Sequence, residues 1–173
     1  MKSTELQANE FGAYYAHYIN LSGDLDLLDS LEASYETVMS FFNDITEAQS
    51  IYSYAEGKWT IKELLQHIID VERIFAYRAL RFAREDKTLL PGFEHNDYVD
   101  VSHANNRSLK SLIKEYQTQR LSTIAMFSSF TTKMLLQIGN ANNLPLSVRA
   151  IGFIVVGHEV HHCNIIKERY LAN

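Results

Sequence analysis

Three histidines carry the main chemical signal of this sequence. His158 and His162 lie four residues apart near the C-terminal end, and His67 lies in an earlier apolar stretch. On a helix, residues four apart lie on one face, one turn above the other. Two such imidazoles can bind one metal ion, and a third from a neighbouring helix leaves a position open for water or substrate. We therefore predict a metal site made of these three histidines.

The residues around the C-terminal pair allow two alternatives. His161 also lies on a face next to that of His158, but His162 is closer to the centre of the apolar stripe of residues 151–165 and is preferred as the ligand. Residues 158–162 read His-Glu-Val-His-His and match the H-E-x-x-H pattern of zinc proteases. The glycine turn and the edge strand expected of such proteases are not evident, so a protease is disfavoured.

Charged residues on the same helical stripes are further candidates. Glu159 has the position of a general base, and Arg120 could contact an anion near the metal. For Arg120 and Arg78, the favoured interpretation is a buried ion pair with Glu72 or Glu159, or a side chain that reaches solvent at the edge of the bundle. Asp70 or Glu72 could also accept a hydrogen bond from a ligand imidazole.

Other titratable side chains are expected to have structural roles. Cys163 is the single cysteine, which excludes an intrachain disulfide. It follows His162 but should point about 100° away from it, so we expect it in the core. His17, His95 and His103 fall in irregular regions and are expected at the surface.

The bulk composition sets broad limits on function. A chain of 173 residues is most simply one domain, spanning residues 1–173. Its net charge of −5 argues against a broad nucleic-acid footprint, which would require a basic face. We find no signal peptide and no apolar run of about 18 residues, which disfavours a membrane protein. We expect a cytoplasmic protein that acts on a small molecule.

Apolar residues recur at spacings of three and four in four long stretches, and strand alternation is not convincing. Thr60-Ile61-Lys62-Glu63 fits a capping box at the start of the second stretch. The fold class is therefore predicted to be all-α, a four-helix bundle. The helices are expected near residues 25–45, 60–85, 108–130 and 146–171.

Three segments lie outside these helices. Residues 1–23 are expected to pack on the bundle as an irregular or short helical lead. Residues 87–106 form a long connection, and loops of this length are often functional. We predict that this loop, which carries Phe93 and Tyr98, or the N-terminal lead lines a pocket that reaches the metal. Residues 139–144 are expected to form a turn-rich loop.

Several segments together resemble the DinB family of DinB/YfiT-like metalloenzymes. The resemblance covers nearly the whole chain from about Glu10, and its joint motif is specific. Its segments are residues 57–63, His67, residues 70–84, 91–93, 98–99, 147–150, 157–162 and 165–171.

This resemblance implies a four-helix bundle in the order up-down-down-up, often a homodimer. It also implies a divalent metal, commonly nickel or zinc, held by one histidine of the second helix and two of the fourth. Those positions are His67, His158 and His162 here. Relatives in the family include enzymes that use a low-molecular-weight thiol, such as bacillithiol or mycothiol, in S-transfer or isomerisation.

The sequence therefore favours a metal-dependent thiol S-transferase that acts on a small electrophile. The ion would favour the thiolate, which is the nucleophilic form of the thiol. A metal-dependent hydrolase with Glu159 or another carboxylate as the base is one alternative. A metal-binding stress protein without catalytic activity is the other.

Overall fold

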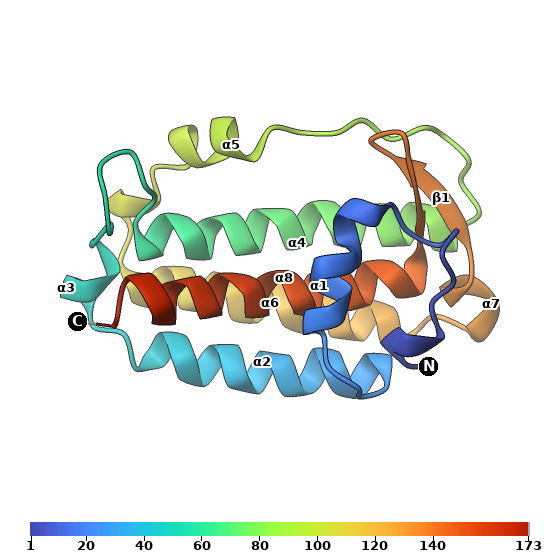
Figure 1. The fold of residues 1–173 in the computed structure, drawn as a ribbon, viewed down its shortest axis with the longest axis horizontal. Coiled ribbons are helices and arrows are strands. Elements are labelled where there is room, and N and C mark those ends of the chain that lie inside the picture. The colour runs from blue at the N-terminus through green and yellow to red at the C-terminus, as the bar shows by residue number, and fades with distance from the viewer. Residues whose placement is uncertain (173) are drawn as a thin grey trace.

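Four long helices form the frame of the computed structural model, which describes residues 1–172 (Figure 1). Helices α2 and α8 run in one direction, and α4 and α6 run in the other, which gives the order up-down-down-up. The predicted bundle is confirmed, and every predicted helix end lies within two residues of the observed one. The four helices are α2 (Leu27–Asn43), α4 (Ile61–Ala83), α6 (Leu109–Ser128) and α8 (Val148–Arg169).

Side-chain caps fix where three of these helices begin. The Thr60 hydroxyl accepts a hydrogen bond from the Glu63 backbone N–H at 3.2 Å, and the Glu63 carboxylate accepts one from the Thr60 N–H at 2.8 Å. This is the capping box that the sequence predicted. At the start of α6 and of α8 only the first half of such a box is present. The hydroxyls of Ser108 and Ser147 each accept a hydrogen bond from the backbone N–H three residues further on. The cap at Thr60 places His67 about two turns inside α4.

The N-terminal lead packs on the bundle, as expected. It contains the short helices η1 (Ser3–Glu5), η2 (Ala13–Tyr15) and α1 (Ala16–Leu21). Its Glu10 carboxylate accepts hydrogen bonds from the Ser147 hydroxyl and from the Arg149 Nε, both at 2.8 Å. These buried contacts attach the lead to the start of α8.

The connection from residue 87 to residue 106 is not a structureless loop. It contains α5 (His95–Ser102) and the short helix η3 (Ala104–Asn106). Glu94 begins α5 by accepting a hydrogen bond from the Asn96 N–H at 3.0 Å. The expectation of one long loop was wrong in this part because a two-turn helix presents too few periodic positions to detect.

Two short strands, β1 (Ile138–Ala141) and β2 (Leu144–Ser147), pair antiparallel where only a turn-rich loop was expected. Their turn residues, Asn142 and Asn143, have positive φ values of 54° and 61°. Asparagine tolerates this backbone region, and two such residues suit a tight hairpin turn. Strands of four residues give too little alternation to detect, so the Asn-Asn pair was the available signal. The small helices α3 (Glu47–Ser50) and α7 (Thr132–Leu135) complete the elements.

A buried polar layer divides the bundle core into two apolar clusters. Each long helix contributes one residue to this layer: Ser34 from α2, Glu72 from α4, Arg120 from α6 and Glu159 from α8. The Arg120 guanidinium donates to both carboxylates, at 2.7 Å to Glu159 and 2.8 Å to Glu72. It also donates to the Ser34 hydroxyl at 2.9 Å. The layer therefore connects all four helices.

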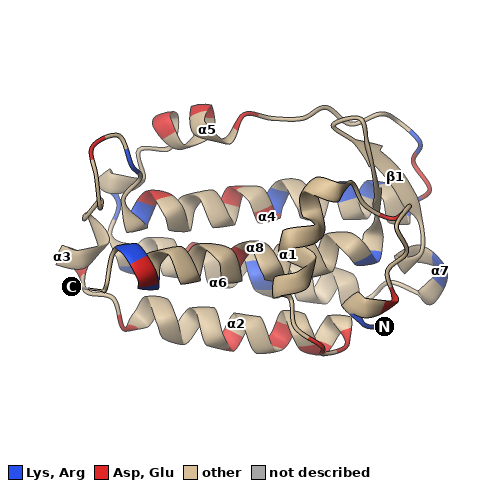
Figure 2. Cartoon of the chain, viewed as in Figure 1, with Lys and Arg blue, Asp and Glu red and all other residues tan. Residues whose placement is uncertain are grey.

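Charged residues are spread along the chain (Figure 2), and most of them are at least partly exposed. Helix α2 carries the exposed acids Asp29, Glu32 and Glu36 and no lysine or arginine, so it presents an acidic face to solvent. Among residues 1–172, no helix combines the length and the apolar character needed to cross a bilayer.

Candidate metal centre

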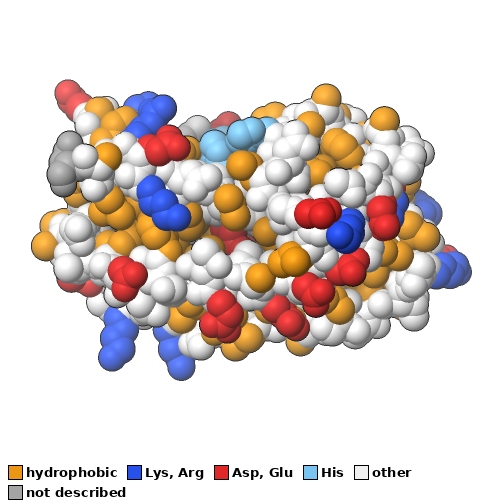
Figure 3. Space-filling view, turned by 60° about the horizontal axis from the view of Figure 1, so that its bottom comes forward, with side chains coloured by type: hydrophobic (Ala, Val, Ile, Leu, Met, Phe, Trp, Pro, Cys, Tyr) orange, Lys and Arg blue, Asp and Glu red, His pale blue; other side chains and the backbone are white. Residues whose placement is uncertain are grey.

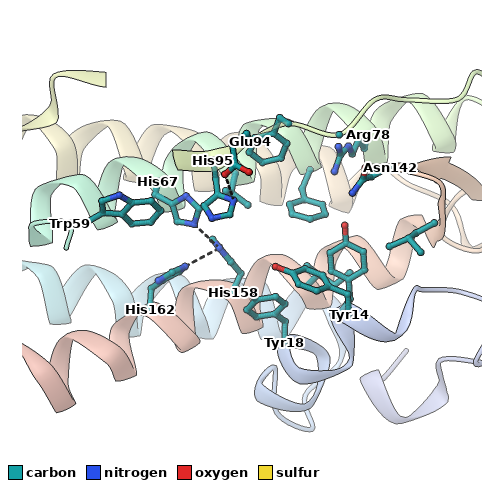
Figure 4. Close-up of a pocket in the computed structure, with 17 residues that line it drawn as sticks. Tyr14, Tyr18, Trp59, His67, Arg78, Glu94, His95, Asn142, His158 and His162 are labelled. Atoms are coloured by element: carbon teal, nitrogen blue, oxygen red, sulfur yellow. Dashed lines mark hydrogen bonds and ion pairs between the residues drawn. The ribbon is translucent and has the colours of Figure 1, made fainter. Parts of the chain in front are cut away.

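Helices α4 and α8 bring the three predicted histidines together (Figure 4). His67 points from α4 toward His158 and His162, which lie one turn apart on α8. All three side chains are buried, with 7–8% of their surface exposed. The convergence that the spacing predicted is therefore present in the structure.

The three rings present the same nitrogen to a common point. The Nε2 atom of His158 lies 3.1 Å from Nε2 of His67 and 3.1 Å from Nε2 of His162. Tetrahedral coordination with zinc–nitrogen bonds of about 2.0–2.1 Å would place ligand nitrogens roughly 3.3 Å apart. The observed separations are close to this value, so the three nitrogens can hold one divalent ion.

Burial keeps these imidazoles in the neutral form that metal coordination requires. It lowers the pKa of His67 to about 3, with smaller contributions from His95 and His161. Burial and the neighbouring histidines also lower the pKa values of His158 and His162 well below the usual value. Protons therefore compete weakly with a metal ion at neutral pH.

Hydrogen bonding inside the cluster does not satisfy its nitrogens. A neutral imidazole nitrogen offers one proton or one lone pair, yet Nε2 of His158 faces two other Nε2 atoms. Nδ1 of His162 is buried and has no hydrogen-bond partner in the described structure. Asp70 and Glu72, proposed above as acceptors, bond instead to Gln66 and Arg120. A cation would engage the three Nε2 lone pairs together, so the residues fit a bound metal.

A cavity of about 490 Å³ opens onto the histidine cluster. Residues of the N-terminal lead and of the connection after α4 line it, which confirms the predicted pocket. The lining residues are Tyr14, Tyr15, Tyr18, Trp59, His67, Val71, Phe75, Arg78, Gly92, Phe93, Glu94, His95, Asn142, Leu144, Ile154, His158 and His162.

Gly157 allows the lead to form one wall of this pocket. A Cβ atom at this position would lie 1.7 Å from the Tyr18 carbonyl oxygen, far closer than van der Waals contact. Only glycine lets α1 approach α8 this closely. The approach places the Tyr18 ring 5.4 Å from the His158 ring, centroid to centroid.

His95 is a site residue that sequence reasoning missed. It is exposed, as expected, but its ring centroid lies 5.5 Å from that of His67 and 5.9 Å from that of Trp59. Its Nδ1 lies 3.5 Å from a Glu94 carboxylate oxygen. His95 therefore stands at the pocket wall beside the ligand cluster. Periodicity could not reveal this, because α5 comes close to α4 only in the folded chain.

Glu159 and Arg120, the predicted catalytic residues, lie in the polar layer of the core and do not line the pocket. Both Glu159 oxygens accept hydrogen bonds from Arg120, and one also accepts from the Tyr116 hydroxyl at 2.8 Å. The buried ion pair favoured for Arg120 is confirmed, with Glu72 and Glu159 both as partners. A catalytic role for the two residues stays a prediction.

His161 lies beside the cluster but faces another partner. Its Nδ1 is 3.2 Å from Nε2 of His17 on α1, and its ring centroid is 5.0 Å from that of His162. Histidine side chains also reach the surface on the face shown in Figure 3. The preference for His162 over His161 in the buried cluster agrees with the structure.

The ion pair favoured for Arg78 is absent, so that part of the interpretation was wrong. Arg78 is buried, and no carboxylate within residues 1–172 lies at ion-pair distance from it. Its Nη2 donates to the Pro91 carbonyl oxygen at 2.9 Å instead. The side chain lines the pocket (Figure 4).

Comparison with known proteins agrees with this fold. The family model of the DinB superfamily matches residues 30–166. The chain therefore belongs to the DinB superfamily. A search of curated proteins returned no match.

A solved structure gives a second comparison. YfiT from Bacillus subtilis, described as a probable metal-dependent hydrolase with an unusual four-helix bundle topology, superposes with a TM-score of 0.74. The match covers 84% of this chain and 85% of YfiT, at 14% sequence identity. At this identity the likeness establishes the shared four-helix fold.

Proposed function

We propose that this protein is a divalent-metal-dependent enzyme that transfers the sulfur of a small thiol to an electrophilic small molecule. His67, His158 and His162 would hold the ion, with nickel or zinc as the expected metal. The observation that carries the proposal is a pocket that combines three converging imidazoles with a wall free of serine, threonine, cysteine and lysine.

The side chains of the pocket wall favour a second small molecule as the source of the nucleophile. Among the described residues that line the pocket there is no serine, threonine, cysteine or lysine. Cys163 lies in the core, where burial raises the pKa of its thiol to about 12, so it is neither accessible nor ionised at neutral pH. A thiol cosubstrate would supply the nucleophile that the chain does not provide.

The residues of the pocket would each have a defined task. A divalent cation held by the three imidazoles supplies positive charge that favours the thiolate over the thiol. His95 accepts the thiol proton and passes it to solvent, because its ring is exposed and lies next to His67. The thiolate sulfur then forms a bond to an electrophilic carbon, and the leaving group departs with the bonding electron pair.

The surrounding side chains would exclude water and hold the imidazoles. Tyr18 and Trp59 pack against the cluster, with ring centroids 5.4 Å from His158 and 5.0 Å from His67 respectively. Glu159 follows His158 on α8 and is fixed by Arg120, so we assign this pair a positioning role. Such support keeps ligand side chains in one orientation.

Hydrolysis is the second candidate, favoured by the description of YfiT as a metal-dependent hydrolase. Water would replace the thiol as the nucleophile, and Glu94 or His95 would accept its proton. Glu94 is the single carboxylate of the pocket wall, and it already accepts hydrogen bonds from Asn96. Because this carboxylate is engaged as a helix cap, we rank hydrolysis second.

Paired assays with and without thiol test the proposal. Protein loaded with zinc or nickel is incubated with 1-chloro-2,4-dinitrobenzene and a panel of thiols: cysteine, glutathione, coenzyme A and bacillithiol. We expect faster thioether formation than with chelator-treated protein, and loss of this advantage in His67→Ala with circular dichroism unchanged. The His103→Ala variant is the matched control, because His103 does not line the pocket.

Two results would contradict the transferase assignment. Metal-dependent cleavage of p-nitrophenyl esters without any thiol, together with no thioether formation across the panel, would favour the hydrolase. Thioether formation that is equal in the wild type and in His67→Ala would show that the histidine cluster does not take part.

A further inference from the structure

Arg78 is a buried cation without a carboxylate partner among residues 1–172. Its side chain lies in the pocket wall with 4% of its surface exposed. It donates one hydrogen bond, to the Pro91 carbonyl oxygen, and its guanidinium carbon lies 5.5 Å and 5.8 Å from the ring centroids of Phe75 and Phe93. These are neutral groups. Burying a charge is costly unless it is paired, so the position suggests a partner that comes from outside the chain.

Two further neighbours of Arg78 are also neutral. The Tyr15 hydroxyl lies beside the guanidinium, and Asn142 lies on the same side of the pocket (Figure 4). Burial lowers the pKa of Arg78, with Tyr15 opposing that shift. An arginine nevertheless stays protonated in proteins. Arg120 shows the contrast, because two carboxylates of the chain neutralise it.

One helical stripe joins Arg78 to the histidine cluster. His67, Val71, Phe75 and Arg78 follow each other on α4 at spacings of four, four and three and all line the pocket. At 1.5 Å per residue, the Cα atoms of His67 and Arg78 lie about 16 Å apart along the helix. The pocket is therefore polar at both ends and apolar between them.

We propose that the pocket selects small molecules that carry a carboxylate, which Arg78 binds, while an apolar segment lies over Val71 and Phe75. The proposal rests on the proposed function only in taking this pocket as the substrate site. The planar guanidinium matches a carboxylate with two parallel hydrogen bonds, which specifies orientation as well as charge. A carboxylate bound there would direct the opposite end of the molecule toward the three histidines.

Trp59 provides a direct readout of binding. It is the single tryptophan of the chain and lies in the pocket wall, 5.0 Å from the His67 ring. Its fluorescence is titrated with hexanoate and octanoate, with hexanol and octanol as neutral probes, and with hexyl phosphate. The full-length chain is used twice, once loaded with zinc and once after chelation. Because the chelated form contains no metal, the affinity of Arg78 for the probes can be measured even if the protein binds no metal.

We expect hexanoate and octanoate to bind at least about tenfold more tightly than the matching alcohols in both forms. Arg78→Met should remove this preference and leave alcohol binding unchanged. Arg78→Lys should keep part of the preference, because the charge stays but the two-bond geometry is lost. Arg73→Met is the control for net charge, since Arg73 lies on the outside of α4 and pairs with Glu115.

Five outcomes would overturn the proposal. Equal affinity for acids and alcohols in the wild type would show that the pocket does not recognise charge. No saturable signal from any probe would show that the pocket binds none of these molecules. If Arg78→Met and Arg78→Lys both weaken the binding of acids and of alcohols to the same extent, Arg78 only holds the Pro91 segment in place. Tighter binding of hexyl phosphate than of hexanoate would assign the site to phosphate esters. A preference seen only with zinc and retained in Arg78→Met would place the anion on the metal.

Discussion

Two of the polar clusters buried in this protein, the Arg120 layer and the histidine cluster, differ in how far the chain itself satisfies them. In the polar layer, Arg120 meets Glu72, Glu159 and Ser34, and each charge has an opposite charge at hydrogen-bond distance. In the histidine cluster, three neutral imidazoles direct nitrogens at one another, and Nδ1 of His162 has no partner among the described residues. The side chains of both clusters are buried, with no more than 8% of their surface exposed.

The difference separates a structural role from a functional one. The Arg120 layer is complete, and it connects the four long helices, so it needs nothing from outside. The histidine cluster is incomplete and opens onto a cavity. A buried polar cluster alone therefore does not indicate a functional site in this fold. A functional site is indicated by a buried polar cluster that lies next to a cavity and whose polar atoms lack partners in the chain.

The largest expected effect of a single substitution tests the polar layer. Arg120→Met leaves Glu72 and Glu159 buried without a cation, and breaking such a pair destabilises proteins by about 3–5 kcal/mol. We expect a loss of this size in the free energy of unfolding, measured by urea denaturation. Arg73→Met, which removes an exposed arginine of α4, should change stability by less than about 1 kcal/mol. A small effect of Arg120→Met would mean that the layer does not hold the bundle together.

A pH titration of metal-free protein tests the histidine cluster. Its imidazoles have lowered pKa values in the folded state, about 3 for His67, and the ordinary value near 6.5 when unfolded. The unfolded state thus binds more protons below pH 6.5, so stability should fall as the pH falls from 6.5 toward 3. The slope is about 1.4 kcal/mol per pH unit for each imidazole. Urea denaturation between pH 7 and pH 5 measures it, and a flat profile would contradict neutral burial.

A smaller effect is expected where α1 approaches α8. Gly157→Ala places a methyl group against the Tyr18 carbonyl oxygen, and overpacking of this kind destabilises by about 1–3 kcal/mol. The lead must move away, so Trp59 fluorescence should also report a more open pocket. Gly152→Ala is the control in the same helix, because a Cβ atom there would meet only side-chain atoms, those of Leu27 and Phe127. Unchanged stability in Gly157→Ala would argue against the close approach.

The smallest effect contrasts the two clusters most sharply. His162→Leu removes a buried nitrogen that has no partner and replaces it with an apolar group of similar size. A buried polar atom without a partner costs desolvation free energy, and the apolar side chain avoids this cost, which offsets the loss of the contact with His158. We therefore expect a change within about 1 kcal/mol in metal-free protein, measured by urea denaturation. Destabilisation as large as that of Arg120→Met would remove the distinction between the clusters.

The sequence predicted the parts of this molecule that depend on helical periodicity. The spacing of His158 and His162 and the apolar stripe around His67 were enough to expect their convergence. The capping box at Thr60 located the start of α4 to within one residue. These signals are local, and the bundle geometry follows from them.

The parts that depend on tertiary contacts could not be predicted in this way. Arg78 and Arg120 occupy similar positions on apolar stripes, and only the fold shows that one meets two carboxylates and the other meets none. His95 reaches the site because α5 lies against α4. The hairpin before α8 has strands too short to give a periodic signal. Each of these depends on which segments become neighbours.

Metal stoichiometry tests the central claim most directly. Wild type, His158→Ala and His161→Ala are dialysed against zinc and against nickel, and bound metal is measured by elemental analysis. We expect stoichiometric metal in the wild type and in His161→Ala, loss in His158→Ala, and nitrogen ligands at about 2.0–2.1 Å by X-ray absorption of the zinc form. No stoichiometric metal in the wild type, or metal retained in His158→Ala, would contradict the assignment of the histidine cluster as the metal centre.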